Sequence, residues 1–276
     1  MNTIRLFVTR HPLVTFFGLA YAFAWWPWLL HVTVPNFPYI QLTPGPFLAA
    51  VTVSALIGGW AEVKAYLRGL LHWRAGVHWY ALALALPVVL ALVAVYLNVL
   101  FGAPPPSPAQ LAGITVFFSG FAYMLLFPLS PGVEELGWRG YAQPRLQVER
   151  SALTASVIVG IMHGLWHLPL FFVPGSAQSN VPFAAFLLTV IALNVLMAWL
   201  YNSAQGSVVI AMIFHAAFDA IGLGFLDFLF SGIDKVRLWW LLAAVLSLAA
   251  GLVVLVMGPN LGLTRSTQAE HAAVIR

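Results

Sequence analysis

The chain is built mainly from long apolar runs that are separated by short polar or proline-rich connections. A helix of about 20 apolar residues is long enough to cross a hydrocarbon core of about 30 Å. Eight runs reach roughly this length, and the pattern therefore predicts an all-α, polytopic transmembrane bundle. The expected membrane helices cover residues 12–30, 45–62, 78–101, 111–131, 152–172, 182–201, 206–227 and 237–257.

The composition agrees with this pattern and excludes most soluble proteins. Of 276 residues, 62% are hydrophobic and 7% are charged, whereas a soluble domain is about 45–50% apolar and about 25% charged. A soluble globule of this size cannot hide so much apolar surface. We therefore expect a multi-pass integral protein of the cell (cytoplasmic) membrane, with membrane lipid around it and no nucleic-acid partner.

The connections and the basic residues predict the organisation of the chain. Because no loop is long enough for a soluble domain, residues 1–276 are expected to form a single integral membrane domain, with 262–276 as a loose C-terminal tail. Lysine and arginine concentrate on the cytoplasmic side of membrane proteins. Placing both the N- and C-termini in the cytoplasm puts ten of the twelve basic residues there and leaves only Lys235 and Arg237 outside.

Ionisable side chains gather in three of the predicted membrane segments. Such groups are expensive at the centre of a membrane helix, by about 2.5–3.5 kcal/mol each on insertion scales, and they therefore suggest function. The chain has no cysteine, so thiol nucleophiles and thiolate metal sites are excluded. The three clusters are Glu134, Glu135 and Arg139 after the fourth run, His163 and His167 in the fifth, and His215 and Asp219 in the seventh.

Helical spacing separates the two glutamates of the first cluster. Adjacent residues on a helix point about 100° apart. Glu135 precedes Arg139 by four residues, which is the favourable order for an ion pair, and Glu134 is left free to point elsewhere. The two histidines of the second cluster share one helix face, as do the histidine and aspartate of the third.

Three kinds of site fit these residue types. A carboxylate in a poorly solvated site can take a proton from water while imidazole orients that water and other donors stabilise the oxyanion, which is the chemistry of carbonyl hydrolysis. Histidine and carboxylate also bind zinc, which activates water itself. The third kind is a proton or ion pathway in a transporter, although no inverted repeat is visible in the sequence.

In order and spacing, the three clusters resemble the motifs of the CPBP (Abi) family of intramembrane metalloprotease-like proteins, which includes the CAAX prenyl endopeptidases. The first motif, E-E-x-x-x-R, matches at Glu134, Glu135 and Arg139. The second, F-x-x-x-H, matches at His167, with His163 where phenylalanine is expected; the third, H-x-x-x-N or D, matches at His215 and Asp219. The motifs span about 134–219, within an expected family core of about 111–230.

This resemblance implies a glutamic intramembrane endopeptidase that needs no cofactor. Its substrate would be a hydrophobic or membrane-tethered peptide or protein. Glu134 would be the general base, assisted by His167, and His215 with Asp219 would form the oxyanion site. The supporting residues would be Glu135, Arg139 and His163.

Two departures from the family pattern keep alternatives open. Asp219 donates a hydrogen bond only when it is protonated; in its ionised form it would orient His215 or bind a metal. His163 adds a further metal ligand, so a zinc-dependent intramembrane protease is one alternative, and the sequence does not decide whether a metal is bound. A non-catalytic membrane scaffold or immunity protein that retains the same residues is another.

The depth of the clusters leaves one structural question open. His167 lies about 22 Å along the fifth predicted helix, whereas Glu134 lies just beyond the inner end of the fourth. The two meet only if residues 133–146 are helical and bend into the bundle after Pro131-Gly132, or if the fifth helix starts in the cytoplasm and tilts. We expect the resulting polar cavity to open toward the cytoplasm.

Overall fold

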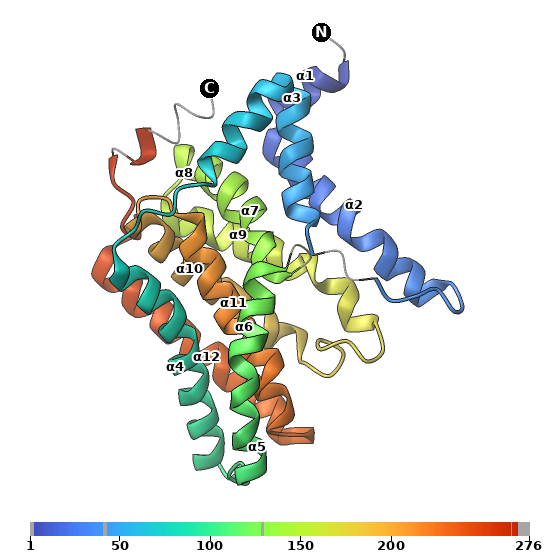
Figure 1. The fold of residues 1–276 in the computed structure, drawn as a ribbon, viewed down its shortest axis with the longest axis vertical. Helices are drawn as coiled ribbons and strands as arrows, with labels where there is room; N and C mark the ends of the chain where they lie inside the picture. Colours follow the sequence, from blue (N-terminus) through green and yellow to red (C-terminus); the bar gives the residue numbers. More distant parts are fainter. Residues whose placement is uncertain (1–2, 41–42, 128–129, 266, 270–276) are drawn as a thin grey trace.

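The computed structural model describes the chain except for residues 1–2, 41–42, 128–129, 266 and 270–276. All regular secondary structure in this part is helical, and eight segments are long and apolar enough to cross a membrane, which confirms the predicted fold class and a multi-pass membrane protein (Figure 1). The main helices are α2 (Pro12–Thr33), α3 (Gly45–Gly69), α4 (Val77–Leu100), α6 (Val116–Leu126), α9 (Ala152–Trp166), α10 (Phe183–Ser203), α11 (Val208–Gly224) and α12 (Gly232–Met257).

Shorter helical elements connect or extend these helices. They are α1 (Thr3–Arg10), α5 (Pro108–Ala112), η1 (Gly113–Thr115), η2 (Pro131–Val133), α7 (Glu134–Gly137), η3 (Trp138–Ala142), α8 (Gln143–Glu149), η4 (Leu168–Phe172) and η5 (Leu226–Phe228). Much of the predicted C-terminal tail, residues 266 and 270–276, lies outside the described residues. In its described part, the Gln268 amide donates a hydrogen bond of 2.8 Å to the Gln147 carbonyl oxygen.

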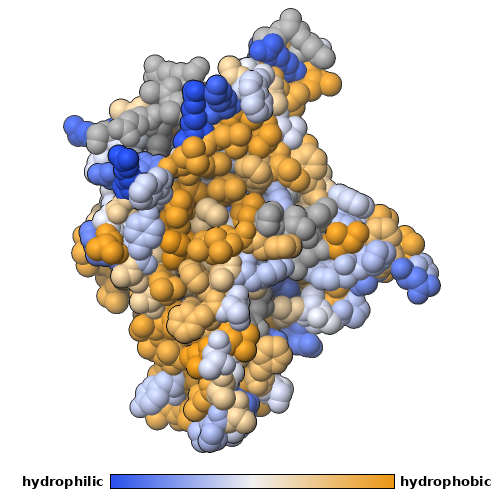
Figure 2. All heavy atoms as spheres, viewed as in Figure 1, coloured by the Kyte–Doolittle hydropathy of each residue, from blue (hydrophilic) through white to orange (hydrophobic). Residues whose placement is uncertain are grey.

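The helices differ in how much of their surface the bundle covers. Within the most apolar part of each span, 67% of residues are buried in α10 and 62% in the span that contains α11, but only 28% in each of α2, α4 and α12. On the face that Figure 2 shows, the surface of the bundle is mainly apolar between its ends. We conclude that α10 and α11 form the centre of the bundle and that the three less buried helices face lipid.

The two ends of the bundle differ in charge. The start of α2 and the end of α12 lie at the same end (Figure 1), which we call the basic end. The opposite end, which we call the distal end, consists of the described connecting residues 34–40, 43–44, 101–107, 173–182 and 225–231 and carries Lys235 and Arg237. The elements at this end carry the described basic residues Arg5 and Arg10 in α1, Lys64 and Arg68 in α3, Arg74 before α4, Arg145 in α8, Arg150 after α8 and Arg265 after α12.

The fourth apolar run departs from the predicted single helix over 111–131. Helix α6 ends at Leu126. From Pro131 onward the chain continues inside the bundle as η2, which contains Pro131 and Gly132, and then as α7, η3 and α8. A β-carbon on Gly132 would lie 2.6 Å from the Met124 carbonyl oxygen, so only glycine allows this return of the chain. The first of the two predicted solutions to the depth problem is therefore the one observed: the segment after the break is helical and bends inward.

Candidate active site

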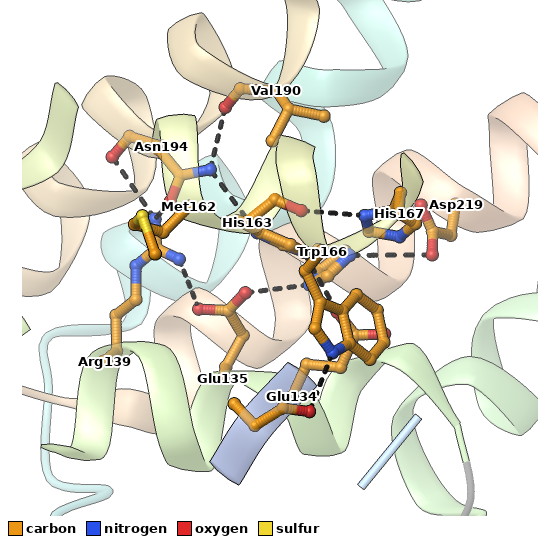
Figure 3. Close-up of polar contacts among 12 residues, drawn as sticks. Glu134, Glu135, Arg139, Met162, His163, Trp166, His167, Val190, Asn194 and Asp219 are labelled. Atoms are coloured by element: carbon orange, nitrogen blue, oxygen red, sulfur yellow. Dashed lines mark hydrogen bonds and ion pairs between the residues drawn. The ribbon is translucent and has the colours of Figure 1, made fainter. Parts of the chain in front are cut away.

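The structure brings all three clusters together in the centre of the bundle (Figure 3). The re-entrant segment, by which we mean residues 131–149, contributes the two glutamates from α7 and the arginine from η3. Helix α9 contributes His163 and is followed directly by its C-cap residue His167, and α11 contributes His215 and Asp219. The Glu134 residue is 1% exposed and Glu135 is fully buried. Ionisable groups are seldom buried so fully without partners, and each of these has them.

Glu135 is held by charged and polar groups on both carboxylate oxygens. Its Oε2 lies 2.8 Å from Arg139 Nη1, so the predicted ion pair is present. Its Oε1 lies 2.8 Å from His215 Nδ1. Because a carboxylate accepts, His215 Nδ1 carries a proton and donates it to this bond. This arrangement ties the re-entrant segment to α11.

Asn194 of α10 completes this arrangement and is absent from the predicted site. Arg139 Nη2 donates a hydrogen bond of 2.7 Å to Asn194 Oδ1, and Asn194 Nδ2 donates one of 2.7 Å to the Val190 carbonyl oxygen. The predicted site consists only of ionisable groups, although an amide in an apolar membrane helix is also a signal of a polar site. We call Glu135, Arg139, Asn194 and His215 the anchor cluster.

Glu134 has a different neighbour. Its Oε2 lies 3.0 Å from His163 Nε2. The Asn194 amide group, oriented by Arg139, presents its nitrogen to His163 Nδ1 at 3.5 Å. Nδ1 is therefore the accepting nitrogen, and Nε2 carries the proton that is donated to Glu134. The Trp138 ring stacks on the imidazole at a centroid distance of 5.1 Å and further restrains it.

His167 points a free nitrogen toward the same region. Its Nδ1 donates to the His163 carbonyl oxygen at 3.0 Å, so its Nε2 holds a lone pair. His163, which was expected only to support the site, is thus in direct contact with Glu134, and His167 lies beside it with a ring-centroid distance of 5.1 Å between the two imidazoles. We call Glu134, His163 and His167 the cavity cluster.

The cavity cluster lines a hollow of about 100 Å³ together with His215 and Asp219. Since one liquid water takes up about 30 Å³, the hollow has room for a few waters. His215 Nε2 lies 3.6 Å from Asp219 Oδ2, which is one turn further along α11. Most of the remaining wall is apolar and includes the side chains of Trp28, Trp166, Phe186, Phe214, Phe218 and Trp239.

The cavity cluster offers the donor types that zinc prefers. Glu134, His163 and His167 can each supply one ligand atom, and these atoms lie within 4.8 Å of one another. However, a histidine that binds a metal through Nε2 normally donates its Nδ1 proton to an acceptor, and Asn194 presents a donor to His163 instead. The donor types therefore fit zinc, whereas this hydrogen bond would have to change for His163 to bind it.

Comparison with known proteins agrees with the sequence motifs. Residues 113–221 match the family model of type II CAAX prenyl endopeptidase Rce1-like proteins, and this segment contains all seven predicted site residues. The match supports the predicted resemblance to the CPBP family over this segment. It is also 34% identical over 139 residues to CAAX prenyl protease 2 of Methanococcus maripaludis, and the aligned region covers 48% of this chain and 51% of that protein. The match thus spans about half of the relative's length.

Proposed function

We propose that this protein is an intramembrane endopeptidase that hydrolyses a peptide bond of a membrane-associated protein or peptide with a water activated by Glu134. The observation that carries the proposal is the contrast between the adjacent glutamates. Glu135 is engaged on both oxygens by the anchor cluster, whereas Glu134 lines a water-sized cavity beside two imidazoles. A buried carboxylate in such a place is suited to proton transfer.

The first chemical step uses the cavity cluster. A water between Glu134 and His167 donates one proton to the carboxylate, while His167 Nε2 accepts a hydrogen bond from the water and orients it. The water oxygen then bonds to the carbonyl carbon of the scissile peptide. When this intermediate collapses, the carbon–nitrogen bond breaks and Glu134 returns the proton to the leaving amine.

His215 is the group that we assign to the oxyanion. Its Nδ1–H is committed to Glu135, so stabilising the negative oxygen requires a second proton on Nε2. The negative charge of Asp219 favours that protonated form, and the 3.6 Å separation is too long for a full hydrogen bond. The Nε2–H can therefore turn to an oxyanion, and we assign Asp219 to orienting His215 rather than to donating.

His163 is a positioning residue in this proposal. The chain of hydrogen bonds from Arg139 through Asn194 sets which imidazole nitrogen carries the proton, and that proton directs the Glu134 carboxylate. A phenylalanine at this position, as in the family motif, would still stack on Trp138 but could not form this hydrogen bond.

The test compares the membrane proteins of cells that carry wild-type protein, Glu134→Gln or Glu149→Gln. Glu149 lies exposed at the end of α8 and provides the same substitution away from the cavity. New peptide N-termini should accumulate with wild type and Glu149→Gln and be absent with Glu134→Gln at equal protein abundance. The same cleavage products in all three would reject Glu134 as the base, and an unchanged cellular phenotype with Glu134→Ala would support the non-catalytic scaffold.

A zinc-dependent protease is a second candidate, because Glu134, His163 and His167 lie close enough to share one ion. Removing metal with a chelator separates the two mechanisms. The glutamate mechanism predicts unchanged cleavage after dialysis against chelator. Loss of cleavage that added zinc restores would favour the zinc enzyme.

A further inference from the structure

A second hollow lies at the basic end of the bundle, apart from the catalytic cavity. It has a volume of about 180 Å³ and shares no lining residue with the cavity beside Glu134. Its walls come from the second half of α3, the connection 70–76, the start of α8 and the turn between α10 and α11. Since one liquid water takes up about 30 Å³, the hollow has room for a small polar ligand. No step of the proposed cleavage uses it.

Arg145 brings a positive charge into this hollow. Its side chain is only 10% exposed, and its Cζ lies 3.6 Å from the centre of the Tyr141 ring, which restrains the guanidinium. It donates one hydrogen bond, of 3.3 Å, to the Tyr141 carbonyl oxygen. Its Nη2 lies 3.9 Å from Glu62 Oε1, which is too far for a hydrogen bond. A guanidinium has five N–H donors, so most of the bonding capacity of this buried group is left for a ligand with oxygen acceptors.

Two oxygen acceptors line the hollow together with Arg145. The first is the Glu62 carboxylate, whose side chain is 27% exposed and is held only by the loose ion pair to Arg145. The second is the Tyr66 hydroxyl, which donates its proton to the Leu136 carbonyl oxygen at 2.7 Å and can therefore only accept from a ligand. A cationic donor and an anionic acceptor thus lie side by side without a close contact. A ligand with both an anion and an ammonium group gives each of them a close partner.

The rim of the hollow has the character of a membrane interface. Trp60 of α3 and Trp73 of the connection 70–76 are largely exposed, as is typical of tryptophan at the level of the lipid headgroups. The Ser207 hydroxyl donates a hydrogen bond of 2.8 Å to the His72 carbonyl oxygen and fixes the connection against the start of α11. His72 and Gln205 are exposed residues of the rim. The hollow is therefore accessible to a headgroup whose acyl chains remain in the bilayer.

We infer that this hollow binds the phosphoethanolamine headgroup of a membrane phospholipid. The planar fork of Arg145 donates to the phosphate oxygens, and the primary ammonium donates to the Glu62 carboxylate and the Tyr66 hydroxyl oxygen. The charges of protein and headgroup then alternate in sign around the hollow. A purely anionic headgroup places its charge next to Glu62 without this compensation, and a choline headgroup has no N–H to donate. The inference does not depend on the protease function.

Lipid binding to the purified full-length protein tests the inference. Delipidated protein in detergent is mixed with dioleoyl phosphatidylethanolamine, dioleoyl phosphatidylglycerol or dioleoyl phosphatidylcholine, and bound lipid is measured by native mass spectrometry. One molecule of phosphatidylethanolamine should bind about tenfold more tightly than either of the other lipids, because only its ammonium forms a charge-assisted hydrogen bond to Glu62. Equal binding of the three lipids, or a preference for phosphatidylglycerol, would overturn the inference.

Substitutions assign the binding to this hollow. Arg145→Gln should weaken binding of phosphatidylethanolamine about tenfold, whereas Arg68→Gln should leave it unchanged. Arg68 is exposed on α3 and does not line the hollow, so it controls for the loss of one positive charge at the basic end. Glu62→Gln should abolish the preference for phosphatidylethanolamine over phosphatidylglycerol. Wild-type binding by Arg145→Gln, or a wild-type preference in Glu62→Gln, would refute the assigned site.

Two controls separate binding from folding and lipid from soluble ligand. The melting temperature of each variant in detergent is recorded, and if Arg145→Gln does not fold, the headgroup preference of Glu62→Gln decides, because that side chain is partly exposed. Soluble glycerophosphoethanolamine carries the same headgroup without acyl chains and should compete only at far higher concentration than the lipid. Competition at equal concentration, or displacement of the lipid by inorganic phosphate, would overturn a membrane lipid as the ligand.

Discussion

The anchor cluster and the cavity cluster lie next to each other and each contain a glutamate hydrogen-bonded to a histidine, but their surroundings differ. In the anchor cluster, the Glu135 carboxylate has a charged or polar partner on each oxygen. In the cavity cluster, Glu134 is bonded to His163 and borders a hollow. Buried charges are stable when their partners satisfy them, and they are chemically useful when some of their bonding capacity remains for a substrate or water.

This difference assigns a task to each glutamate of the E-E-x-x-x-R motif. Glu135 joins the re-entrant segment to α11 through His215 and, through Arg139, to α10. That framework holds Glu134 at the wall of the cavity. We therefore expect changes in the anchor cluster to act on stability first and changes in the cavity cluster to act on the rate of cleavage first.

The largest effect on activity is expected for Glu134→Gln. The amide keeps the shape of the side chain but cannot take a proton from water, so cleavage should fall by about 10²–10⁴-fold. The melting temperature in detergent should stay close to that of the wild type. Cleavage assays on the purified variant check this, with Glu149→Gln as the control; normal cleavage would contradict the account.

The largest effect on stability is expected for Arg139→Met. This change leaves the buried Glu135 without its cationic partner, and losing one member of a buried pair destabilises by about 3–5 kcal/mol. Unfolding of the purified protein measures the loss. The double change Glu135→Leu with Arg139→Met removes both charges and should recover much of the stability; equal stability of wild type and the single variant would refute the assigned anchor.

A smaller effect on rate is expected for His163→Phe. The ring still stacks on Trp138, but Glu134 loses a charge-assisted hydrogen bond of about 1.5 kcal/mol, which corresponds to about tenfold slower cleavage. The rate constant at saturating substrate is the measurement. His163→Gln, which can restore a donor, should recover part of the rate, and a positioning role would be excluded if both variants cleaved at the wild-type rate.

The smallest effect is expected in the lipid-facing helices, at Arg237→Gln. Arg237 pairs with Asp234 at 2.6 Å and with Asn98 at 2.7 Å near the distal end, where both charged side chains are partly exposed. An exposed pair contributes about 1 kcal/mol or less. Stability should change by no more than that and cleavage should be unchanged; a loss comparable to that of Arg139→Met would show that the two ion pairs were wrongly ranked.

The sequence was sufficient for the parts of the fold that depend on hydropathy alone. The eight spans are confirmed because apolar runs of this length report directly on the membrane. The inward bend after Pro131–Gly132 was only one of two predicted solutions, since it depends on how closely Gly132 approaches the Met124 carbonyl oxygen. The resemblance to the CPBP family is supported over residues 113–221, whereas the roles of the site residues and the location in the cell membrane stay predictions.

The finer features of the site depend on contacts that no motif describes. Asn194 lies more than twenty residues from any predicted site residue. Its side chain is uncharged, so the ionisable residues that define the predicted site do not point to it. The proton position on His163 follows from the orientation of the Asn194 amide, and the lining of the cavity follows from which segments meet around it. Both features depend on contacts between segments that are far apart in the sequence, so the spacing of residues along the chain does not predict them.

The division of labour between the adjacent glutamates is tested most directly by one paired measurement. Cleavage rate and unfolding midpoint are determined for Glu134→Gln and Glu135→Gln in the same proteoliposome preparation. The account predicts that Glu134→Gln loses cleavage at a wild-type midpoint, whereas Glu135→Gln unfolds at a clearly lower temperature. A variant pair in which Glu134→Gln cleaves normally, or in which only Glu134→Gln is destabilised, would contradict it.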